Sequence, residues 1–200
     1  MRKMFFLISV LLITVFTAFQ VFASGGSLVV DNADLLTDEE ETILTSDLGK
    51  LREKYSVDVV VVTTDTTDGI SSMTYADNFY DQNGYSPDGV LLLINMDTDN
   101  GGADRGWWIS TAGSAITAFT DDGIAYIGGQ VSAYLSEGEY FEAFSQFAYL
   151  SDRFIDRSES GDPYDGGTYP EPEKSPAWGL YAVIAVIAGV LAGLIVTSSQ

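Results

Sequence analysis

The sequence contains no cysteine and no histidine, and only nine of its 200 residues are lysine or arginine. The absence of the first two residue types excludes disulfide bonds, thiol redox chemistry, zinc sites with cysteine or histidine ligands, and catalytic triads that depend on histidine. Any enzymatic chemistry in this chain therefore has to use carboxylates, hydroxyl groups, a few basic side chains and a hard cation.

Positive charge is especially scarce in the central part of the chain. All 29 acidic residues lie between Asp31 and Glu173, whereas Arg2 and Lys3 precede the first hydrophobic run. The part between the hydrophobic ends thus carries seven basic residues against 29 acidic ones, a formal charge of −22. Nucleic acids and anionic membrane surfaces both attract basic proteins, so we expect no nucleic-acid partner and no electrostatic attraction to a membrane.

The N-terminal end has the three parts of a secretory signal peptide. Arg2 and Lys3 are followed by a hydrophobic run over residues 4–19 and by Val21 and Ala23, which suit the −3 and −1 positions of a cleavage site. The alternative is an uncleaved anchor, but the run is short for a membrane span. We predict a signal peptide over residues 1–23.

The C-terminal end predicts a membrane anchor. Residues 177–196 contain no charged side chain, and a helix of this length is about 30 Å long, enough to cross a bilayer. Trp178 and Tyr181 lie at its start, where aromatic belts occur. A buried core helix is the alternative, but the run has no polar stripe. It follows residues 157–176, which hold four of the five prolines and predict an extended stalk.

The central part of the chain, residues 28–156, predicts one α/β domain. Helical spacing of hydrophobic residues, a Thr37–Glu40 capping box and short β-branched runs indicate the order α-β-α-β-β-α-α. The expected helices cover residues 37–51, 73–80, 124–135 and 140–154, and the expected strands cover residues 57–62, 89–94 and 107–111. The first two strands should be parallel because a helix joins them, and the last two antiparallel because a turn does.

Continuous hydrophobic strands require helices on both faces of their sheet. We therefore predict a three-layer α/β/α sandwich with a small mixed central sheet, followed by a C-terminal transmembrane helix. The predicted topology is a single-pass protein of the cell membrane with its folded domain outside the cytoplasm.

Four short segments, taken in order, resemble one known family. They are Val30-Asp31-x-Ala33-x-Leu35-Leu36, Asp88-Gly89-Val90-Leu91-Leu92-Leu93, Thr111-Ala112-Gly113 followed by Thr120-Asp121-Asp122, and Gly138-Glu139-Tyr140-Phe141-Glu142-Ala143. Together with the two hydrophobic ends, they are similar to the TPM-domain family, also called TPM phosphatases. The resemblance implies an α/β/α sandwich outside the cytoplasm. It also implies divalent-cation binding and acid phosphatase activity, which are attributed to some members.

The carboxylates that could hold a cation are predicted from the strand directions and from the resemblance. If the last two strands are antiparallel, Asp88 lies at the same sheet edge as Gly113 and the loop that leads to Asp121 and Asp122. Carboxylate and carbonyl oxygens there would suit Ca²⁺ or Mg²⁺. The alternative is that Thr120 or Asp121 caps a helix and Asp88 is a turn residue.

The resemblance adds Asp31 to this set, although the strand directions place Asp31 nearer the opposite edge, with Asp65 and Asp68. The candidate metal ligands are therefore Asp31, Asp88, Asp121 and Asp122.

Two functions follow from these features. The first is a membrane-anchored, extracytoplasmic module that is acidic, binds Ca²⁺ or Mg²⁺, and interacts with envelope or membrane proteins. The alternative is a metal-dependent acid phosphatase acting on phosphomonoesters, with a metal-bound water or an aspartate as nucleophile. A strongly negative surface repels phosphate unless a bound cation reverses the local field, which favours the first function.

Overall fold

The computed structural model describes residues 25–97 and 106–171. These residues form a mixed four-stranded sheet and five helices. In chain order the elements are β1 (Val29–Asp31), α2 (Asp38–Tyr55), β2 (Asp58–Thr64), α3 (Ser72–Gln82), β3 (Gly89–Asn95), β4 (Gly106–Ala112), α4 (Ala115–Ala118), α5 (Asp121–Leu135) and α6 (Tyr140–Glu159).

The strands lie in the order β1-β2-β3-β4. β2 and β3 are parallel and β3 and β4 are antiparallel, which confirms both predicted pairings. Every residue of β2 and β3 is buried, as expected for the two central strands. The sequence did not predict β1, which has three residues and pairs in parallel with β2. The short helix α4 was also not predicted.

Local sequence explains how α2 begins and ends. The hydroxyl of Thr37 accepts a hydrogen bond from the Glu40 backbone N–H, and the Glu40 carboxylate accepts one from the Thr37 backbone N–H at 2.8 Å, forming the predicted capping box. Four acidic residues occupy the first turn and Arg52 and Lys54 the last, which complements the helix dipole. Ser56, in the left-handed conformation, ends the helix.

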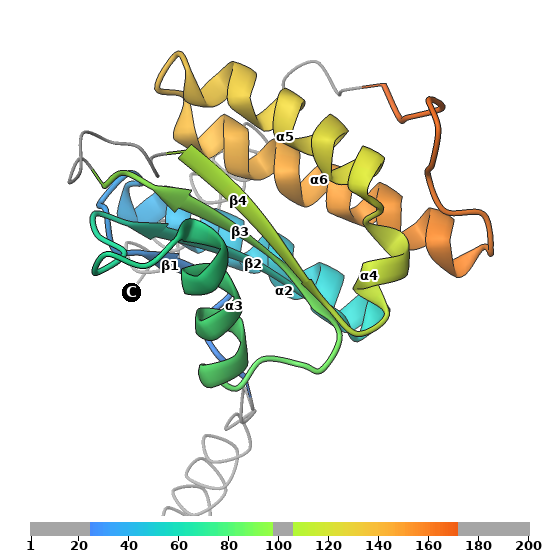
Figure 1. Cartoon of the computed structure of the whole chain (residues 1–200), viewed down its shortest axis with the longest axis horizontal. Coiled ribbons are helices and arrows are strands. Elements are labelled where there is room, and N and C mark those ends of the chain that lie inside the picture. The colour runs from blue at the N-terminus through green and yellow to red at the C-terminus, as the bar shows by residue number, and fades with distance from the viewer. Residues whose placement is uncertain (1–24, 98–105, 172–200) are drawn as a thin grey trace, which may run out of the picture.

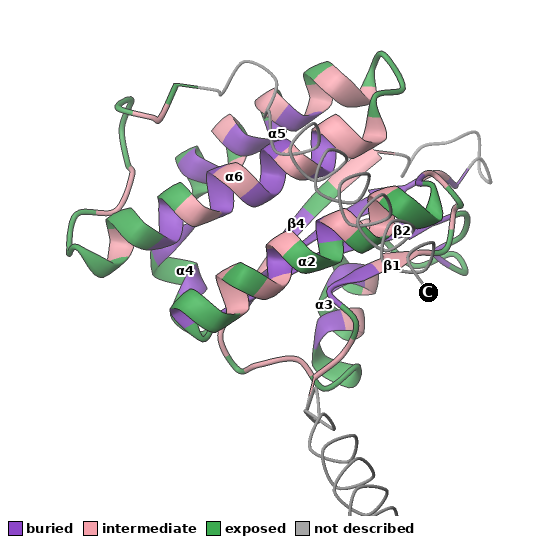
Figure 2. Cartoon of the chain, turned by 180° about the vertical axis from the view of Figure 1, so that it is seen from behind, coloured by how far each residue is buried: buried purple, intermediate pink, exposed green. Residues whose placement is uncertain are grey.

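The helices cover both faces of the sheet. α6 packs between α2 and α5 in one group of helices, whereas α3 packs on β3 and β4 from the other side (Figures 1 and 2). The buried faces of these elements form one hydrophobic core, in which Phe144, Phe147 and Phe154 are the largest fully buried side chains. Gly128 lets α5 approach β4, because a Cβ atom there would overlap the ring of Trp107.

A partly buried ion pair joins α2 to the start of β2; the Arg52 side chain is 29% exposed. Arg52 Nε donates to Asp58 Oδ1 at 2.6 Å, and the Asp58 side chain is only 4% exposed. The other carboxylate oxygen of Asp58 accepts the Ser86 backbone N–H at 2.8 Å, while Arg52 also donates to the carbonyl of Gly26 at 3.3 Å. This pair thus connects three separate chain segments.

The segment predicted as an extended stalk is partly folded onto the domain. α6 continues to Glu159, and the following residues pack through Tyr164 and Tyr169. The ring of Tyr169 stacks on Tyr126 of α5 with centroids 4.5 Å apart, and the Tyr126 hydroxyl donates to the carbonyl of Pro170 at 2.5 Å. Proline and acidic content predicted the stalk, and composition of this kind does not reveal the contacts that Tyr164 and Tyr169 make.

The predicted signal peptide (1–23), the end of the stalk and the predicted transmembrane helix (177–196) lie outside the described residues. Among the helices that are described, none combines the length and hydrophobicity that crossing a membrane requires.

Candidate functional site

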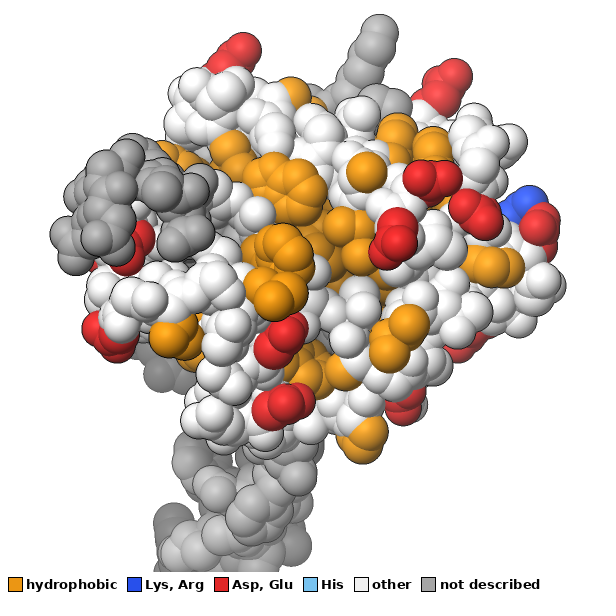
Figure 3. All heavy atoms as spheres, in the orientation of Figure 1, with side chains coloured by type: hydrophobic (Ala, Val, Ile, Leu, Met, Phe, Trp, Pro, Cys, Tyr) orange, Lys and Arg blue, Asp and Glu red, His pale blue; other side chains and the backbone are white. Residues whose placement is uncertain are grey.

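Charge is distributed unevenly over the described surface. The residues described contain five bases, and all five lie on α2 or α6: Lys50, Arg52, Lys54, Arg153 and Arg157. On the opposite side of the molecule, acidic side chains surround a central group of hydrophobic ones (Figure 3). α2 and α6 also carry ten acidic residues, so among the described elements they are the ones in which both signs of charge occur.

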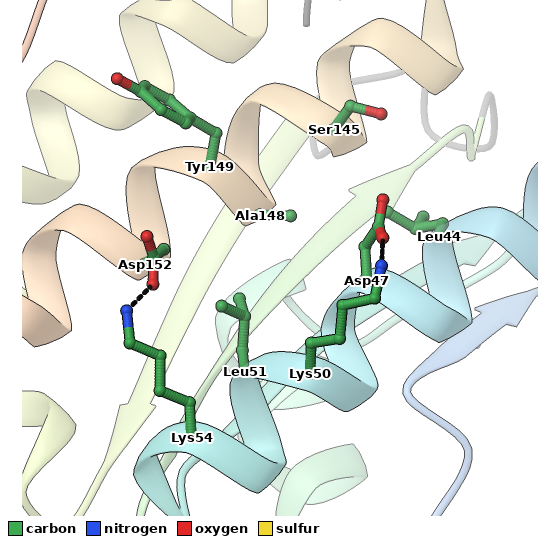
Figure 4. Close-up of a pocket in the computed structure, with 9 residues that line it drawn as sticks. All are labelled: Leu44, Asp47, Lys50, Leu51, Lys54, Ser145, Ala148, Tyr149 and Asp152. Atoms are coloured by element: carbon green, nitrogen blue, oxygen red, sulfur yellow. Dashed lines mark hydrogen bonds and ion pairs between the residues drawn. The ribbon is translucent and has the colours of Figure 1, made fainter. Parts of the chain in front are cut away.

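A groove lies on this face, between α2 and α6 (Figure 4). Its volume is about 240 Å³. Helical spacing on both elements places one row of side chains from each helix along it. α2 contributes Leu44, Asp47, Lys50, Leu51 and Lys54, and α6 contributes Ser145, Ala148, Tyr149 and Asp152.

The lining of the groove is mainly hydrophobic and its rim is charged. Leu44 and Ala148 are buried, and Leu51 packs against the core beside them. Lys50 and Lys54 lie along the rim with side chains 61% and 51% exposed, so both ammonium groups are accessible from outside. Hydrophobic grooves edged by a few polar groups are typical binding sites.

Two ion pairs lie along the groove, and one of them crosses it. Lys50 Nζ lies 2.6 Å from Asp47 Oδ1 on the same helix, whereas Lys54 Nζ reaches across to Asp152 Oδ1 at 2.9 Å. The Tyr55 hydroxyl donates to the same Asp152 oxygen at 2.7 Å, so two residues of α2 are tied to one carboxylate of α6. This connection closes one end of the groove and fixes the separation of the helices.

The ionised state of Asp152 supports this connection at neutral pH. Partial burial raises the pKa of Asp152, but hydrogen bonds from Lys54 and Tyr55 outweigh burial and hold that pKa below its ordinary value. The contribution of these bonds to the stability of the fold is therefore present above the ordinary carboxyl pKa. It is lost as the pH falls through the lowered pKa of Asp152.

Asp88 lies where the strand directions predicted. β3 starts beside the end of β4, and the Ser114 backbone N–H donates to Asp88 Oδ1 at 2.6 Å. This bond lowers the pKa of Asp88. Gly113 makes the approach possible, because its φ of 59° suits glycine and a Cβ atom there would overlap the Asp88 carboxylate. Asp88 thus stabilises the turn after β4.

The other three candidate ligands lie at two further places. Asp121 and Asp122 are in the first turn of α5, whose N-cap is Thr120; its hydroxyl accepts the Gly123 N–H at 3.1 Å. Asp31 pairs with Thr63 near the end of β2, the sheet edge opposite Asp88, as the strand directions indicated. Its carboxylate accepts hydrogen bonds from the Leu36 N–H and the Thr63 hydroxyl.

The candidate ligands therefore do not form one cluster. Within residues 25–97 and 106–171 no three acidic residues lie close enough together to hold a metal ion. Cation binding through Asp88 stays a prediction. A test that removes the Asp88 carboxylate must also account for the loss of its hydrogen bond from Ser114.

We expect millimolar Ca²⁺ to raise the melting temperature of the full chain, and Asp88→Ala to remove most of that increase. Asp88→Ala also loses the bond to Ser114 and so changes the melting temperature without calcium. The quantity to compare is therefore the difference in melting temperature between calcium-free and calcium-loaded samples of each variant. Asp81→Ala, which removes an acid elsewhere, is the matched control. If NaCl at equal ionic strength reproduces the whole shift, the stabilisation is charge screening and not a site.

Comparison with known proteins identifies the domain. The family model described as the TPM domain matches residues 29–152. The chain belongs to the TPM-domain family. The match begins at β1 and ends within α6, so this TPM domain includes the sheet and both sides of the groove.

Individual relatives agree with this assignment. UPF0603 protein YdjH of Bacillus subtilis (strain 168) is 31% identical over 123 residues, which are 62% of this chain and 46% of that protein. The present chain thus matches about half the length of this relative. The solution structure of the N-terminal domain of a protein from P. gingivalis has a TM-score of 0.55 at 18% identity, covering 72% of this chain and 91% of that domain, and shows the same fold.

The N-terminal domain of cg2496 protein from Corynebacterium glutamicum is also similar, with a TM-score of 0.49 at 13% identity. That match covers 76% of this chain and 90% of that domain.

The sequence did not predict the groove of this TPM domain. Lys54 and Asp152 are 98 positions apart, and each side of the groove is the outer stripe of an ordinary amphipathic helix. The available signal was the clustering of the domain's bases, apart from Arg105, in two short stretches, residues 50–54 and 153–157.

Proposed function

We propose that this TPM domain is a binding module held outside the cytoplasm by a membrane anchor. Its α2–α6 groove binds an acidic, amphipathic segment of a partner protein. The observation that carries the proposal is the groove itself, with a hydrophobic lining flanked by exposed Lys50 and Lys54. Hydrophobic side chains of the partner would fill the groove, as in other helix-in-groove complexes, and its carboxylates would meet the two lysines.

Charge at the groove bears on this choice of partner. Lys50 and Lys54 are paired with Asp47 and Asp152, which also line the groove, so the carboxylates of an acidic partner would have to compete with these two aspartates for the lysines. Arg153 adds a further base, since its guanidinium lies 5.3 Å from the ring of Tyr149 at the edge of the groove.

The test is site-specific photo-crosslinking in the native cells. A benzophenone amino acid at position 149, in the groove, should give a discrete crosslink to a partner segment in which hydrophobic residues recur at helical spacing among acidic ones. The same group at position 116, on an exposed side chain of α4, should not. Absence of a discrete crosslink at position 149 overturns the proposal.

Charge reversal provides a matched pair of variants. Lys50→Glu should strongly reduce the crosslink at position 149, because it places a carboxylate on the groove rim. Arg157→Glu should leave the crosslink unchanged; like Lys50, Arg157 is an exposed base paired with a nearby aspartate, Asp162, but it does not line the groove. Equal effects of the two changes would indicate non-specific attraction.

Two further measurements separate this function from its alternatives. Protease added to spheroplasts should cleave the domain, and full protection would overturn the extracytoplasmic location. The purified chain should not hydrolyse para-nitrophenyl phosphate with or without Mg²⁺ or Ca²⁺. Turnover that EDTA abolishes and Asp88→Asn lowers would instead identify a metal-dependent phosphatase.

A further inference from the structure

The outer strand of the sheet, β4, offers a second interaction surface on the other side of the molecule. β4 is at the end of the strand order, and its seven residues pair in unbroken antiparallel register with β3 (Figure 1). Among the described residues no strand pairs with its other edge. Backbone N–H and C=O groups of alternate residues along such an edge point outward and can pair with an added strand.

This edge lacks the features that usually prevent such pairing. Natural edge strands are interrupted by bulges or prolines, or carry charged side chains, particularly lysine. β4 has the sequence Gly-Trp-Trp-Ile-Ser-Thr-Ala, with no charge and no proline, and its register with β3 contains no bulge. An unprotected strand of this length is either a site of aggregation or a binding site.

Hydrophobic side chains are exposed beside β4. Trp108 is 37% exposed, and Met73 at the start of α3 is 48% exposed. These two residues belong to the same end of the strand. Asn95 of β3 connects them. It pairs with Gly106, which is two residues before Trp108 on β4. Its side chain donates a hydrogen bond at 3.1 Å to Ser72, the residue before Met73. Figure 3 shows the hydrophobic group on this face, with acidic side chains around it.

The elements around β4 carry only negative charge. α3, α4, α5 and β4 contain no lysine or arginine, whereas α3 and α5 hold Asp77, Asp81, Asp121 and Asp122. Asp77 contacts the strand directly, because its carboxylate accepts a hydrogen bond from the Ser110 hydroxyl at 2.5 Å. A second copy of this chain would bring the same acidic elements together, whereas a basic segment would be attracted.

We propose that the β4 edge binds an extended basic segment of a partner protein, which adds to the sheet as a fifth strand. Backbone hydrogen bonds along β4 supply the pairing, a hydrophobic side chain of the partner packs on Trp108, and lysine or arginine side chains approach Asp77. A partner strand matching all seven residues of β4 spans about 23 Å. This site goes beyond the α2–α6 groove, since it uses different elements and takes a partner of opposite charge.

The test uses the full chain and three synthetic peptides. The probe is Lys-Val-Lys-Val-Lys-Val-Lys, the charge control replaces every lysine by glutamate, and the strand control replaces the central valine by proline, which keeps the charge but breaks the strand. Binding is measured by fluorescence anisotropy and located by amide hydrogen exchange. We expect only the first peptide to bind with protection of residues 106–112.

Two substitutions with equal charge change test the role of the strand. Trp108→Lys should weaken binding of the probe by about tenfold, since it removes a cross-strand aromatic contact and adds a repelling charge. Ile116→Lys, at an exposed hydrophobic residue of α4, should have little effect. Melting temperatures of both variants show whether they fold.

Three results would overturn the proposal. The first is equal binding of the proline peptide, which would reduce the effect to general attraction between opposite charges. The second is binding without protection of residues 106–112. The third is protection of these residues in the absence of peptide that increases with protein concentration, which would identify a second copy of the chain as the occupant.

Discussion

Arg52→Met should lower the free energy of unfolding by up to about 3–5 kcal/mol, the cost of removing one partner of a fully buried ion pair, because Asp58 is buried although Arg52 is 29% exposed. The reason is that Asp58 cannot move to water when it loses Arg52. Its side chain is 4% exposed, and one of its oxygens is held by the Ser86 backbone N–H. The uncompensated carboxylate then stays among buried groups. Urea denaturation of the full chain measures the loss.

Lys50→Met is the matched control for this change. Lys50 is on the same helix and also pairs with an aspartate at 2.6 Å, but its side chain is 61% exposed. Exposed pairs contribute about 0–1 kcal/mol, so the control should remain close to the unchanged chain. If Arg52→Met costs no more than Lys50→Met, then Asp58 is solvated or re-paired and the ion pair does not hold the three segments together.

Phe154→Ala should cost about 3–5 kcal/mol, as for other fully buried aromatic residues, and should also release the segment after α6. Phe154 is 0% exposed, and its ring centroid lies 5.7 Å from that of Phe119 and 4.9 Å from that of Tyr164. The Phe154 ring therefore packs in the hydrophobic core and also contacts the segment of residues 160–171. Denaturation measures the first effect, and limited proteolysis after Ser160 the second.

Two controls separate these effects. Tyr169→Ala should increase cleavage within residues 160–171 with a smaller loss of stability, because Tyr169 is only partly buried and stacks chiefly on Tyr126. Ile116→Ala, at a side chain 59% exposed, should change neither property. Rapid cleavage of the unchanged chain at residues 160–171 would contradict the packing of this segment.

The two proposed binding surfaces differ in charge, and the topology of the domain separates them. The groove is formed by α2 and α6, which carry all the bases of the described residues together with ten acids, whereas β4 is flanked by elements with acids alone. One TPM domain could therefore hold an acidic segment and a basic segment at the same time. Lys50→Glu should affect only the first site and Trp108→Lys only the second, so failure of one proposal is distinguishable from failure of the other.

The sequence by itself determined the elements that depend on neighbours along the chain. The capping box of Thr37 and Glu40 predicted where α2 begins, and the continuous hydrophobic runs predicted the two buried central strands. Connection length predicted the parallel and antiparallel pairings, because a helix must return the chain whereas a turn reverses it. The position of Asp88 beside Gly113 followed from those directions alone.

Only the tertiary structure decided the features that depend on distant residues. β1 has three residues, too few for any periodicity, and is a strand because β2 supplies its hydrogen bonds. Residues 160–171 look like a linker by composition, yet the rings of Phe154 and Tyr126 hold them to the domain. The groove exists because α2 and α6, about a hundred residues apart, pack side by side. The edge of β4 is open because none of the described strands pairs with its outer side. Contacts of this kind depend on which surfaces meet when the chain folds, and no local pattern of residues records them.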